Sequence, residues 1–204
     1  MSSYDHEHFE RLYTHDPDPW AVLTSTYERD KYQATLHALS RPRYAQALEL
    51  GCSIGGLTRW LAPRCQTLVA VDTSETALQR ARSACPAPQV KFVQAHLPDG
   101  DWQGTFDLVV LSEILYYFSV PALAQLAERL SRMTTAHTDF VVVHWTGETD
   151  YPLSGDCATE LFRHLMYADV RMRMRNDRYR LETWSPGLRS FSGPLMPHEA
   201  TRNK

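Results

Sequence analysis

A glycine-rich turn flanked by carboxylates is the first group of residues in this chain that could do chemistry. Residues 48–56 read LELGCSIGG, so Glu49 comes two residues before Gly51 and the turn ends at Gly56. A phosphate-binding P-loop requires a lysine and then a serine or threonine directly after its last glycine. Here Gly56 is followed by Leu57, which excludes a P-loop.

The same turn also departs from a dinucleotide-binding fingerprint. That fingerprint needs glycine where this chain has Ser53, and Glu49 would be unfavourable beside a pyrophosphate. S-adenosylmethionine (SAM) fits better, because it has no phosphate and carries a cationic ammonium, a cationic sulfonium and two ribose hydroxyls. A carboxylate suits a cation, and Asp72 after the next apolar run can accept from both hydroxyls. The turn therefore predicts a SAM site.

The elements that would position these residues alternate along the chain. Short apolar runs predict parallel strands, and stretches with apolar residues at helical spacing predict the helices between them. The strands are expected at residues 45–50, 67–71, 90–93, 106–111 and 140–144, and the helices at 28–39, 55–62, 74–85, 121–133 and 154–167. Residues 170–176 and 179–184 predict a terminal antiparallel hairpin. The expected fold is α/β and Rossmann-like, a seven-stranded, mostly parallel sheet with helices on both faces.

The 204 residues are expected to form a single domain. Residues 1–40 are predicted to be an N-terminal lid or arm followed by a helix, because two prolines in DPDPW at 16–20 preclude a regular helix there. Residues 45–185 would form the Rossmann-like core. Residues 186–204 have little to bury and are predicted to be a flexible tail.

Candidate cofactor contacts follow from the predicted sheet. In a doubly wound sheet, ligands lie outside the carboxyl ends of the strands, so the residues at those ends are the candidates. Trp20 is added from the arm, where stacking on adenine or a sugar ring competes with an ordinary packing role. The predicted cofactor-binding residues are Trp20, Glu49, Gly51, Cys52, Asp72, Thr73, His96, Leu97 and Ser112.

Three pieces together resemble the class I SAM-dependent methyltransferases: ELGCSIGG at 49–56, Asp72, and FDLVV at 106–110 leading into SE. They cover about residues 45–145 in the order typical of that family. The flanking segments DPW, STYE, SEILYY, HW and DYPLSGD resemble the nodulation N-methyltransferases of the NodS family. This second resemblance implies methyl transfer from SAM to the free amine of a de-N-acetylated chitooligosaccharide, an intermediate in lipochitooligosaccharide (Nod-factor) synthesis.

Two positions depart from the family pattern. Ser53 stands where the family often has glycine, and we interpret it as a tolerated small residue. His96 stands where the family often has an acid that reaches the adenine amino group. The His96 ring or the adjacent backbone is therefore expected to serve instead.

Binding of the methyl acceptor requires residues that can hold an amine. Much of a sugar amine is neutral near pH 7, so attack on the methyl group is mainly a matter of position and desolvation. A carboxylate or imidazole nearby would hold the amine and accept its proton. The predicted catalytic residues are Glu113, Tyr116 and His144, and the predicted substrate-binding residues are Tyr117, Trp145 and Asp156.

These candidates have structural alternatives. An acid such as Glu113 also suits a helix N-terminus, and His144 at the end of an apolar strand also suits a satisfied core histidine. Because Tyr116 and Tyr117 are adjacent, at most one of them is expected to face the site. Residues 112–115 read SEIL and lack the (N/D)PP(Y/F) turn of enzymes that methylate base or amide nitrogens, which disfavours a nucleobase target.

The net charge, the cysteine spacing and the lengths of the apolar runs limit the possible partners and location. A net charge of −3 argues against nucleic acid as the main partner. The four cysteines form no CxxC pair, which disfavours a metal site and a disulfide framework and favours a reducing cytoplasm. The polar start MSSYDHEHFERLY lacks the apolar core of a signal peptide. The chain contains no run of 18 apolar residues, so no membrane span is predicted.

Arg171, Arg173 and Arg175 share one face of the predicted strand at 170–176. One interpretation is a solvated edge face that deters aggregation, and the other is a contact surface for an anionic partner. Three rival functions also stay open: methylation of another small amine or hydroxyl metabolite, an NADP-dependent oxidoreductase, and a non-catalytic SAM-binding protein.

Overall fold

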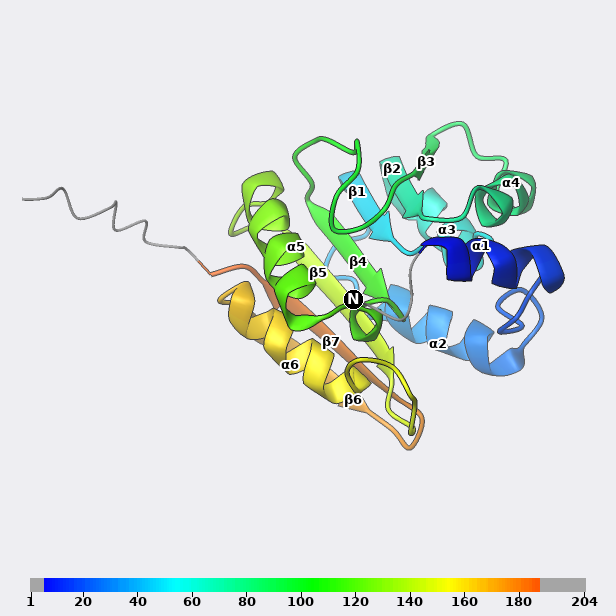
Figure 1. The fold of residues 1–204 in the computed structure, drawn as a ribbon. Helices are drawn as coiled ribbons and strands as arrows, with labels where there is room; N and C mark the ends of the chain where they lie inside the picture. The colour runs from blue at the N-terminus through cyan, green and yellow to red at the C-terminus, as the bar shows by residue number, and fades with distance from the viewer. Residues whose placement is uncertain (1–5, 188–204) are drawn as a thin grey trace, which may run out of the picture.

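The computed structural model describes residues 6–187, which form an α/β fold around a central sheet (Figure 1). A flexible tail was predicted over residues 186–204, and from residue 188 onward this segment lies outside the described residues. Within residues 6–187, no helix is long and apolar enough to cross a membrane.

The sheet has seven strands in the order β3-β2-β1-β4-β5-β7-β6. Strands β1 to β5 run parallel to one another, whereas β7 runs antiparallel to both β5 and β6. The strands are β1 (Tyr44–Leu50), β2 (Cys65–Asp72), β3 (Val90–Gln94), β4 (Leu108–Ser112), β5 (Asp139–Trp145), β6 (Asp169–Arg175) and β7 (Tyr179–Ser185). The predicted mostly parallel sheet with a C-terminal antiparallel hairpin is confirmed.

Helices cover both faces of the sheet because side chains alternate along each strand. Leu48 and Leu50 of β1 join the core that includes α5 and α6, whereas Ala47 joins the core that includes α2 and α3. Figure 1 accordingly shows α5 and α6 on one side of the sheet and the other helices on the opposite side. The core helices are α2 (Thr26–His37), α3 (Thr58–Leu61), α4 (Glu75–Ala84), α5 (Val120–Met133) and α6 (Gly155–Leu165).

Three of these helices begin at serine caps. The Ser74 side chain accepts a hydrogen bond from the N–H of Ala77, and Ser25 and Ser154 cap α2 and α6 in the same way. Each cap satisfies an N–H group that has no partner within the helix and is worth about 1 kcal/mol. The caps therefore fix where each of these three helices begins.

The helix predicted over residues 55–62 is shorter than expected. Only Thr58–Leu61 is α-helical (α3), and the 3-10 turn η1 (Ala62–Arg64) ends it. Gly55 has a φ of +82°, which lies outside the right-handed helical region, so the helix cannot begin at that residue. The residues before α3 remain an open loop at the end of β1.

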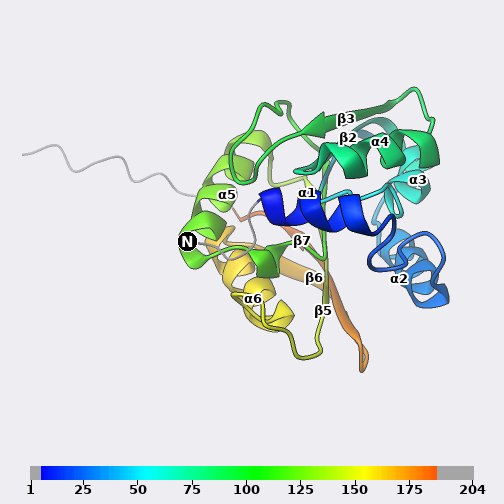
Figure 2. The ribbon, with the colours of Figure 1, turned by 45° about the vertical axis from the view of Figure 1, so that its right-hand side comes forward.

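The N-terminal arm contains a helix that was not predicted. This helix, α1 (His6–His15), ends before the two prolines and packs on α4, as Figure 2 shows. Tyr13 is buried against Ala77 of α4, and Arg80 Nη1 donates to the Tyr13 carbonyl at 2.7 Å. Phe9 and Tyr13 stand four residues apart, the spacing of one helical face, which was the available signal.

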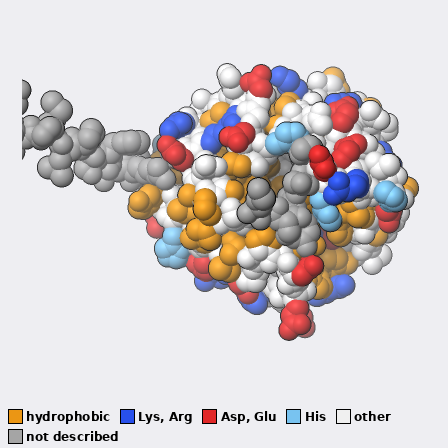
Figure 3. Space-filling model, viewed as in Figure 1, with side chains coloured by type: hydrophobic (Ala, Val, Ile, Leu, Met, Phe, Trp, Pro, Cys, Tyr) orange, Lys and Arg blue, Asp and Glu red, His pale blue; other side chains and the backbone are white. Residues whose placement is uncertain are grey.

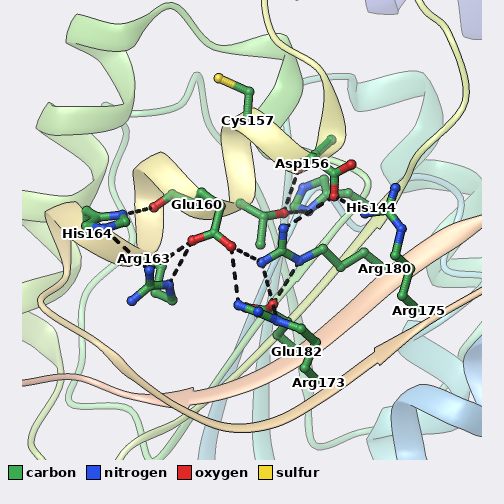
Figure 4. Close-up of polar contacts among 12 residues, drawn as sticks. His144, Asp156, Cys157, Glu160, Arg163, His164, Arg173, Arg175, Arg180 and Glu182 are labelled. Carbon is green, nitrogen blue, oxygen red and sulfur yellow. Dashed lines mark hydrogen bonds and ion pairs between the residues drawn. The ribbon is translucent and has the colours of Figure 1, made fainter.

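The arginines of β6 are paired with carboxylates of the protein itself. The pairs are Arg171–Asp139, Arg173–Glu160, Arg173–Glu182 and Arg175–Asp156. Figure 4 shows Arg180 of β7 in the same cluster, extending between Glu160 and Glu182. All three β6 arginines are exposed but internally neutralised, which agrees with a solvated edge face and not with a surface for an anionic partner.

Candidate active site

A cavity of ≈780 Å³ lies at the carboxyl ends of the parallel strands, where the sheet topology predicts a ligand site. It is bounded by the loop after β1, by residues that follow β2, β4 and β5, and by the N-terminal segment with α1 and α2. Every residue predicted to bind the cofactor lines this cavity. Figure 3 shows hydrophobic side chains gathered toward the middle of the face seen in Figure 1, with charged side chains mostly at its margin.

The loop after β1 requires glycine because of its backbone conformation and its close contacts with neighbouring residues. Gly51 has a φ of +77°, and a Cβ at this position would lie 2.4 Å from Ile114 Cδ1. A Cβ at Gly56 would lie 2.7 Å from the Tyr32 hydroxyl. The N–H groups of Gly51 and Cys52 both donate to the carbonyl of Val71, which fixes the loop against β2. The cavity wall at this point is therefore bare backbone.

Ser53 is more than a tolerated variant. Its φ of +52° is the left-handed conformation that glycine adopts at little cost, which explains a preference for glycine here. Its N–H donates to Asp72 Oδ2 at 2.8 Å, and its hydroxyl accepts a hydrogen bond from Tyr13 at 2.5 Å. The serine thus connects the loop to α1 of the N-terminal segment.

Asp72 stands at the end of β2 and is 7% exposed. Besides the Ser53 N–H, it accepts the N–H of Ser74 on Oδ1 at 3.0 Å. Burial raises the pKa of Asp72, although these backbone donors oppose the rise. Each carboxylate oxygen keeps a lone pair beyond its backbone contact, as the two hydroxyls of a ribose would need.

Glu49 is the more unusual carboxylate. It is 2% exposed, lines the cavity, and its Oε2 has no hydrogen-bond partner among residues 6–187. Burial raises the pKa of Glu49 to about 8; the Thr58 hydroxyl opposes the rise and Asp72 adds to it. Keeping a buried carboxylate ionised costs free energy unless a cation binds beside it. The ammonium of SAM is such a cation, so the residues present fit this cofactor.

The part of the cavity predicted to contact adenine contains Thr73, His96 and Leu97. The Thr73 hydroxyl and His96 Nδ1 are 2.7 Å apart, which orients the imidazole beside the end of β3. Trp20 is 38% exposed and packs edge-on against Tyr13, with ring centroids 5.6 Å apart. The predicted contacts of these residues with the cofactor stay predictions.

Glu113, predicted to act on the acceptor, lines the cavity directly after β4. Its backbone has a φ of +55°, which is strained for a residue with a side chain. Its Oε1 accepts from Lys31 Nζ at 2.6 Å, and its Oε2 accepts from the Tyr116 hydroxyl at 2.9 Å and the Trp145 N–H at 2.8 Å. Burial raises the pKa of Glu113, but the lowering contributions, led by the charge of Lys31, outweigh burial, so the pKa lies below its usual value.

Tyrosine and tryptophan rings surround this carboxylate. Tyr116 stacks on Tyr151 with centroids 4.9 Å apart and an interplanar angle of 19°, and Tyr117 lies 4.6 Å from the same ring. Trp145 lies edge-on to Tyr27 at 6.0 Å. The expectation that only one of Tyr116 and Tyr117 faces the site was wrong, because both line the cavity. The 3-10 turn η2 (Leu115–Tyr117) lets neighbouring side chains share one wall.

The structure does not bring His144 into the cavity. The side chain is fully buried, its Nε2 accepts the Leu115 N–H at 3.0 Å, and its Nδ1 lies 3.1 Å from the Thr159 hydroxyl. Burial lowers the pKa of His144 to about 4, so the ring is neutral near pH 7. His144 therefore holds η2 against α6, and the prediction that it acts directly on the substrate needs correction.

Asp156 also lies away from the cavity. It is in the first turn of α6, with Oδ1 2.5 Å from Arg175 Nη1 and 3.3 Å from Arg180 Nη1 (Figure 4). These guanidinium groups lower the pKa of Asp156. Its carboxylate is engaged in the β6–β7 cluster, so the prediction that it binds the substrate is corrected. In the loop that precedes α6, Tyr151 and Thr149 line the cavity instead.

Several residues that line the cavity were not predicted from the sequence. They share aromatic or cationic side chains, and they are Phe9, Tyr13, Tyr27, Lys31, Tyr32, Tyr151 and Arg178. Tyr27 and Lys31 stand four residues apart on α2, so a helical face with one polar end was the available signal. Arg178, in the β6–β7 turn, comes within 4.0 Å of the Tyr27 ring centroid, a contact that sequence spacing could not reveal.

The sheet order, the glycine loop and the acidic strand ends are those of the class I SAM-dependent methyltransferase fold. Among residues 6–187, no group of three or more His, Cys, Asp or Glu side chains could hold a metal ion. Residues 5–144 match the family Nodulation protein S (NodS), and the chain belongs to that family.

Known proteins agree with this assignment. Nodulation protein S of Bradyrhizobium diazoefficiens is 35% identical over 115 residues, which are 55% of this chain and 54% of that protein. A crystal structure from Pseudomonas syringae, provisionally assigned as a methyltransferase, has 31% identity and a TM-score of 0.70 over 79% of this chain and 99% of its own. The N-methyltransferase NodS of Bradyrhizobium japonicum WM9, in complex with S-adenosyl-L-homocysteine (SAH), has 18% identity and a TM-score of 0.78 over 90% and 99%. The chain spans about half the length of the curated relatives it matches.

Proposed function

We propose that this chain is a SAM-dependent N-methyltransferase that acts on the free amine of a de-N-acetylated chitooligosaccharide in Nod-factor synthesis. The observation that carries the proposal is a single cavity with two unlike carboxylates. Glu49 lacks an ion pair among residues 6–187, while Glu113 is ionised and held among aromatic rings. The first suits a cationic cofactor and the second a basic acceptor.

On the cofactor side, Glu49 would bind the ammonium of SAM and Asp72 the ribose hydroxyls. The bare backbone at Gly51 allows close approach, and the Thr73–His96 pair would contact the adenine. When bound, SAM supplies a methyl group on a sulfonium, and the amine lone pair takes that methyl group while the C–S bonding electrons stay on sulfur. These residues need only bind and orient, because they form no covalent bond with either molecule.

On the acceptor side, an amine fits better than a hydroxyl. A hydroxyl acceptor needs a strong base nearby, whereas a neutral amine needs only position and desolvation. Glu113, with its pKa below the usual value and three donors on its carboxylate, is a weak base but a firm anchor for an N–H group. The product nitrogen becomes an ammonium and loses its proton to solvent.

The identification of the acceptor as a chitooligosaccharide is the more specific part of the proposal. It is supported by membership of the NodS family and by rings at the acceptor end of the cavity: Tyr27, Tyr117, Trp145 and Tyr151. Aromatic rings offer flat apolar faces with a polar edge, which suits a pyranose with its C–H face and its hydroxyls. Arg178 beside Tyr27 adds donors for sugar oxygens.

We also propose that the chain acts as one domain, with residues 1–40 as a lid over the cofactor. Tyr13 and Trp20 line the cavity, and the Tyr13 hydroxyl donates to Ser53 of the glycine loop. Closure by this segment would exclude water from the amine and the sulfonium. The cytoplasmic location stays a prediction.

Mass spectrometry of chitooligosaccharides after incubation with SAM tests the function. A mass gain of one methyl group is expected only for oligomers with a free amine. Equal methylation of fully acetylated oligomers would contradict the amine assignment and favour a hydroxyl acceptor. SAH binding without any transfer would favour a non-catalytic SAM-binding protein, and tighter binding of NADP than of SAH would favour an oxidoreductase.

A further inference from the structure

Lys31 is a lysine in an unusual place. Its side chain is 2% exposed, and its Nζ lies 2.8 Å from Glu28 Oε1 and 2.6 Å from Glu113 Oε1. The ammonium also lies 5.0 Å from the centroid of the Tyr27 ring. Burying an ammonium is costly, and it is tolerated where carboxylates compensate the charge. The position of Lys31 on the cavity wall suggests a role beyond packing.

Glu113, the carboxylate that Lys31 contacts, is held from three directions. Lys31 comes from α2, the Tyr116 hydroxyl from η2, and the Trp145 N–H from the end of β5. The Glu113 backbone keeps a positive φ, and strain of this kind persists where surrounding contacts over-determine the conformation. The direction of this one side chain is therefore set by three elements that are distant in sequence.

We propose that Lys31 is the positioning residue of the acceptor site: by bridging Glu28 and Glu113, it keeps the Glu113 carboxylate ionised and fixed at the cavity wall where the amine binds. This inference rests on the proposed function. Lys31 acts through Glu113 and does not itself need to touch the substrate.

The charges of the group explain what Lys31 contributes. Two carboxylates and one ammonium leave a net charge of about −1 beside the amine. As the methyl group moves, positive charge passes from sulfur to nitrogen, and a fixed anion near nitrogen stabilises it without reorganisation. Without Lys31, burial would favour the protonated, neutral form of Glu113 and remove that anion.

Other charged and titratable groups around Glu113 do not replace Lys31. Glu28, from α2, carries the same sign as Glu113. Tyr116, from η2, has its pKa raised well above its usual value by burial and by Glu113, so it remains a neutral donor. His144, from β5, is neutral near pH 7 because burial lowers its pKa to about 4. Among residues 6–187, Lys31 is the cation paired with this carboxylate.

The test is the pH dependence of methyl transfer in Lys31→Met, together with a direct titration of Glu113. In Lys31→Met the acid limb of kcat/KM for a mono-deacetylated chitooligosaccharide should move up by about 1 pH unit or more. Carbon-13 NMR of labelled glutamate, with Glu113 assigned by loss of its signal in Glu113→Gln, should show the same shift without any acceptor present. Lys31→Arg, which keeps the cation, should restore most of the wild-type profile.

Arg132→Met is the matched control, because it removes a cation from the exposed Arg132–Glu128 pair of α5 and should leave both profiles unchanged. SAH binding reports folding; if Lys31→Met fails to bind SAH, Lys31→Gln carries the same test. An unchanged Glu113 titration in a folded Lys31 variant would overturn the proposal. If the wild type methylates no amine at any pH, the proposed function fails, whereas the NMR titration still decides the role of Lys31.

Discussion

Glu49 and Glu113 are buried carboxylates in two halves of one cavity, and they are in opposite states. Burial raises the pKa of Glu49 to about 8, whereas the pKa of Glu113 lies below its usual value because Lys31 compensates for burial. Both side chains lie at the carboxyl ends of parallel strands, so their surroundings and not their places in the fold make the difference. One carboxylate receives its cation from the protein, and the other fits a cation brought by a ligand.

The largest effect should come from the acceptor half. Glu113→Gln removes the fixed anion and should lower kcat/KM for the amine acceptor by about 100-fold. SAH affinity should change less than about threefold, because Glu113 lies outside the cofactor half. Methyl-transfer kinetics and calorimetry measure the two quantities. A parallel loss of SAH affinity would show that the two halves are not separate.

The reverse separation is expected for Glu49→Gln. Loss of one charge-assisted contact in a buried site costs about 1.5–3 kcal/mol, so SAH should bind about 10- to 100-fold more weakly. The Glu113 titration should not move. Cys157→Ser is a suitable control, because Cys157 is exposed on α6 and does not line the cavity. Unchanged SAH affinity in Glu49→Gln would remove the cofactor role of Glu49.

His144 tests whether a buried group near the acceptor half acts only on structure. Its pKa of about 4 in the folded state is below the ordinary value of about 6.5, so folding favours the neutral ring. Stability should therefore fall as the pH decreases from about 6.5 toward 4, by up to about 3 kcal/mol from this group. Urea unfolding of His144→Gln should lack this part of the slope.

The same variant separates stability from activity. His144→Gln should leave the acid limb of kcat/KM where it is in the wild type, once the protein is folded. A shift of that limb would return His144 to the catalytic residues.

Ser53 should give the smallest effect. Ser53→Gly relieves the positive φ but loses the contact with Tyr13, so the free energy of unfolding should change by less than about 1 kcal/mol. Ser53→Ala loses the contact without relieving the strain and should be the less stable of the two. Thermal unfolding of both variants measures the difference. Equal stabilities would mean that the backbone at Ser53 is not strained.

The parts of the site that the sequence predicted are those set by strand ends. The glycine loop, Asp72 and Glu113 follow directly from apolar runs, so their arrangement at one edge of the sheet could be deduced. His144 also ends a strand, but its side chain points to the core side, and a one-residue change in alternation decides which side that is.

The other residues of the acceptor half could not be predicted in the same way. Lys31, Tyr151 and Arg178 come from α2, a loop and a hairpin turn, and only the packed structure brings them together. The pairing of Asp156 with Arg175 and Arg180 likewise depends on how α6 lies over the hairpin. Sequence spacing reports neighbours on one element, and these contacts join different elements.

The most direct test of the contrast between Glu49 and Glu113 is proton release on SAH binding. With a pKa of about 8, Glu49 is mostly protonated at pH 7 and must ionise to bind an ammonium, so binding weakens as the pH falls below about 8. Calorimetry at pH 7 in two buffers of different ionisation enthalpy should give release of about one proton from the wild type and much less from Glu49→Gln. No release from the wild type, or equal release from both, would contradict the account.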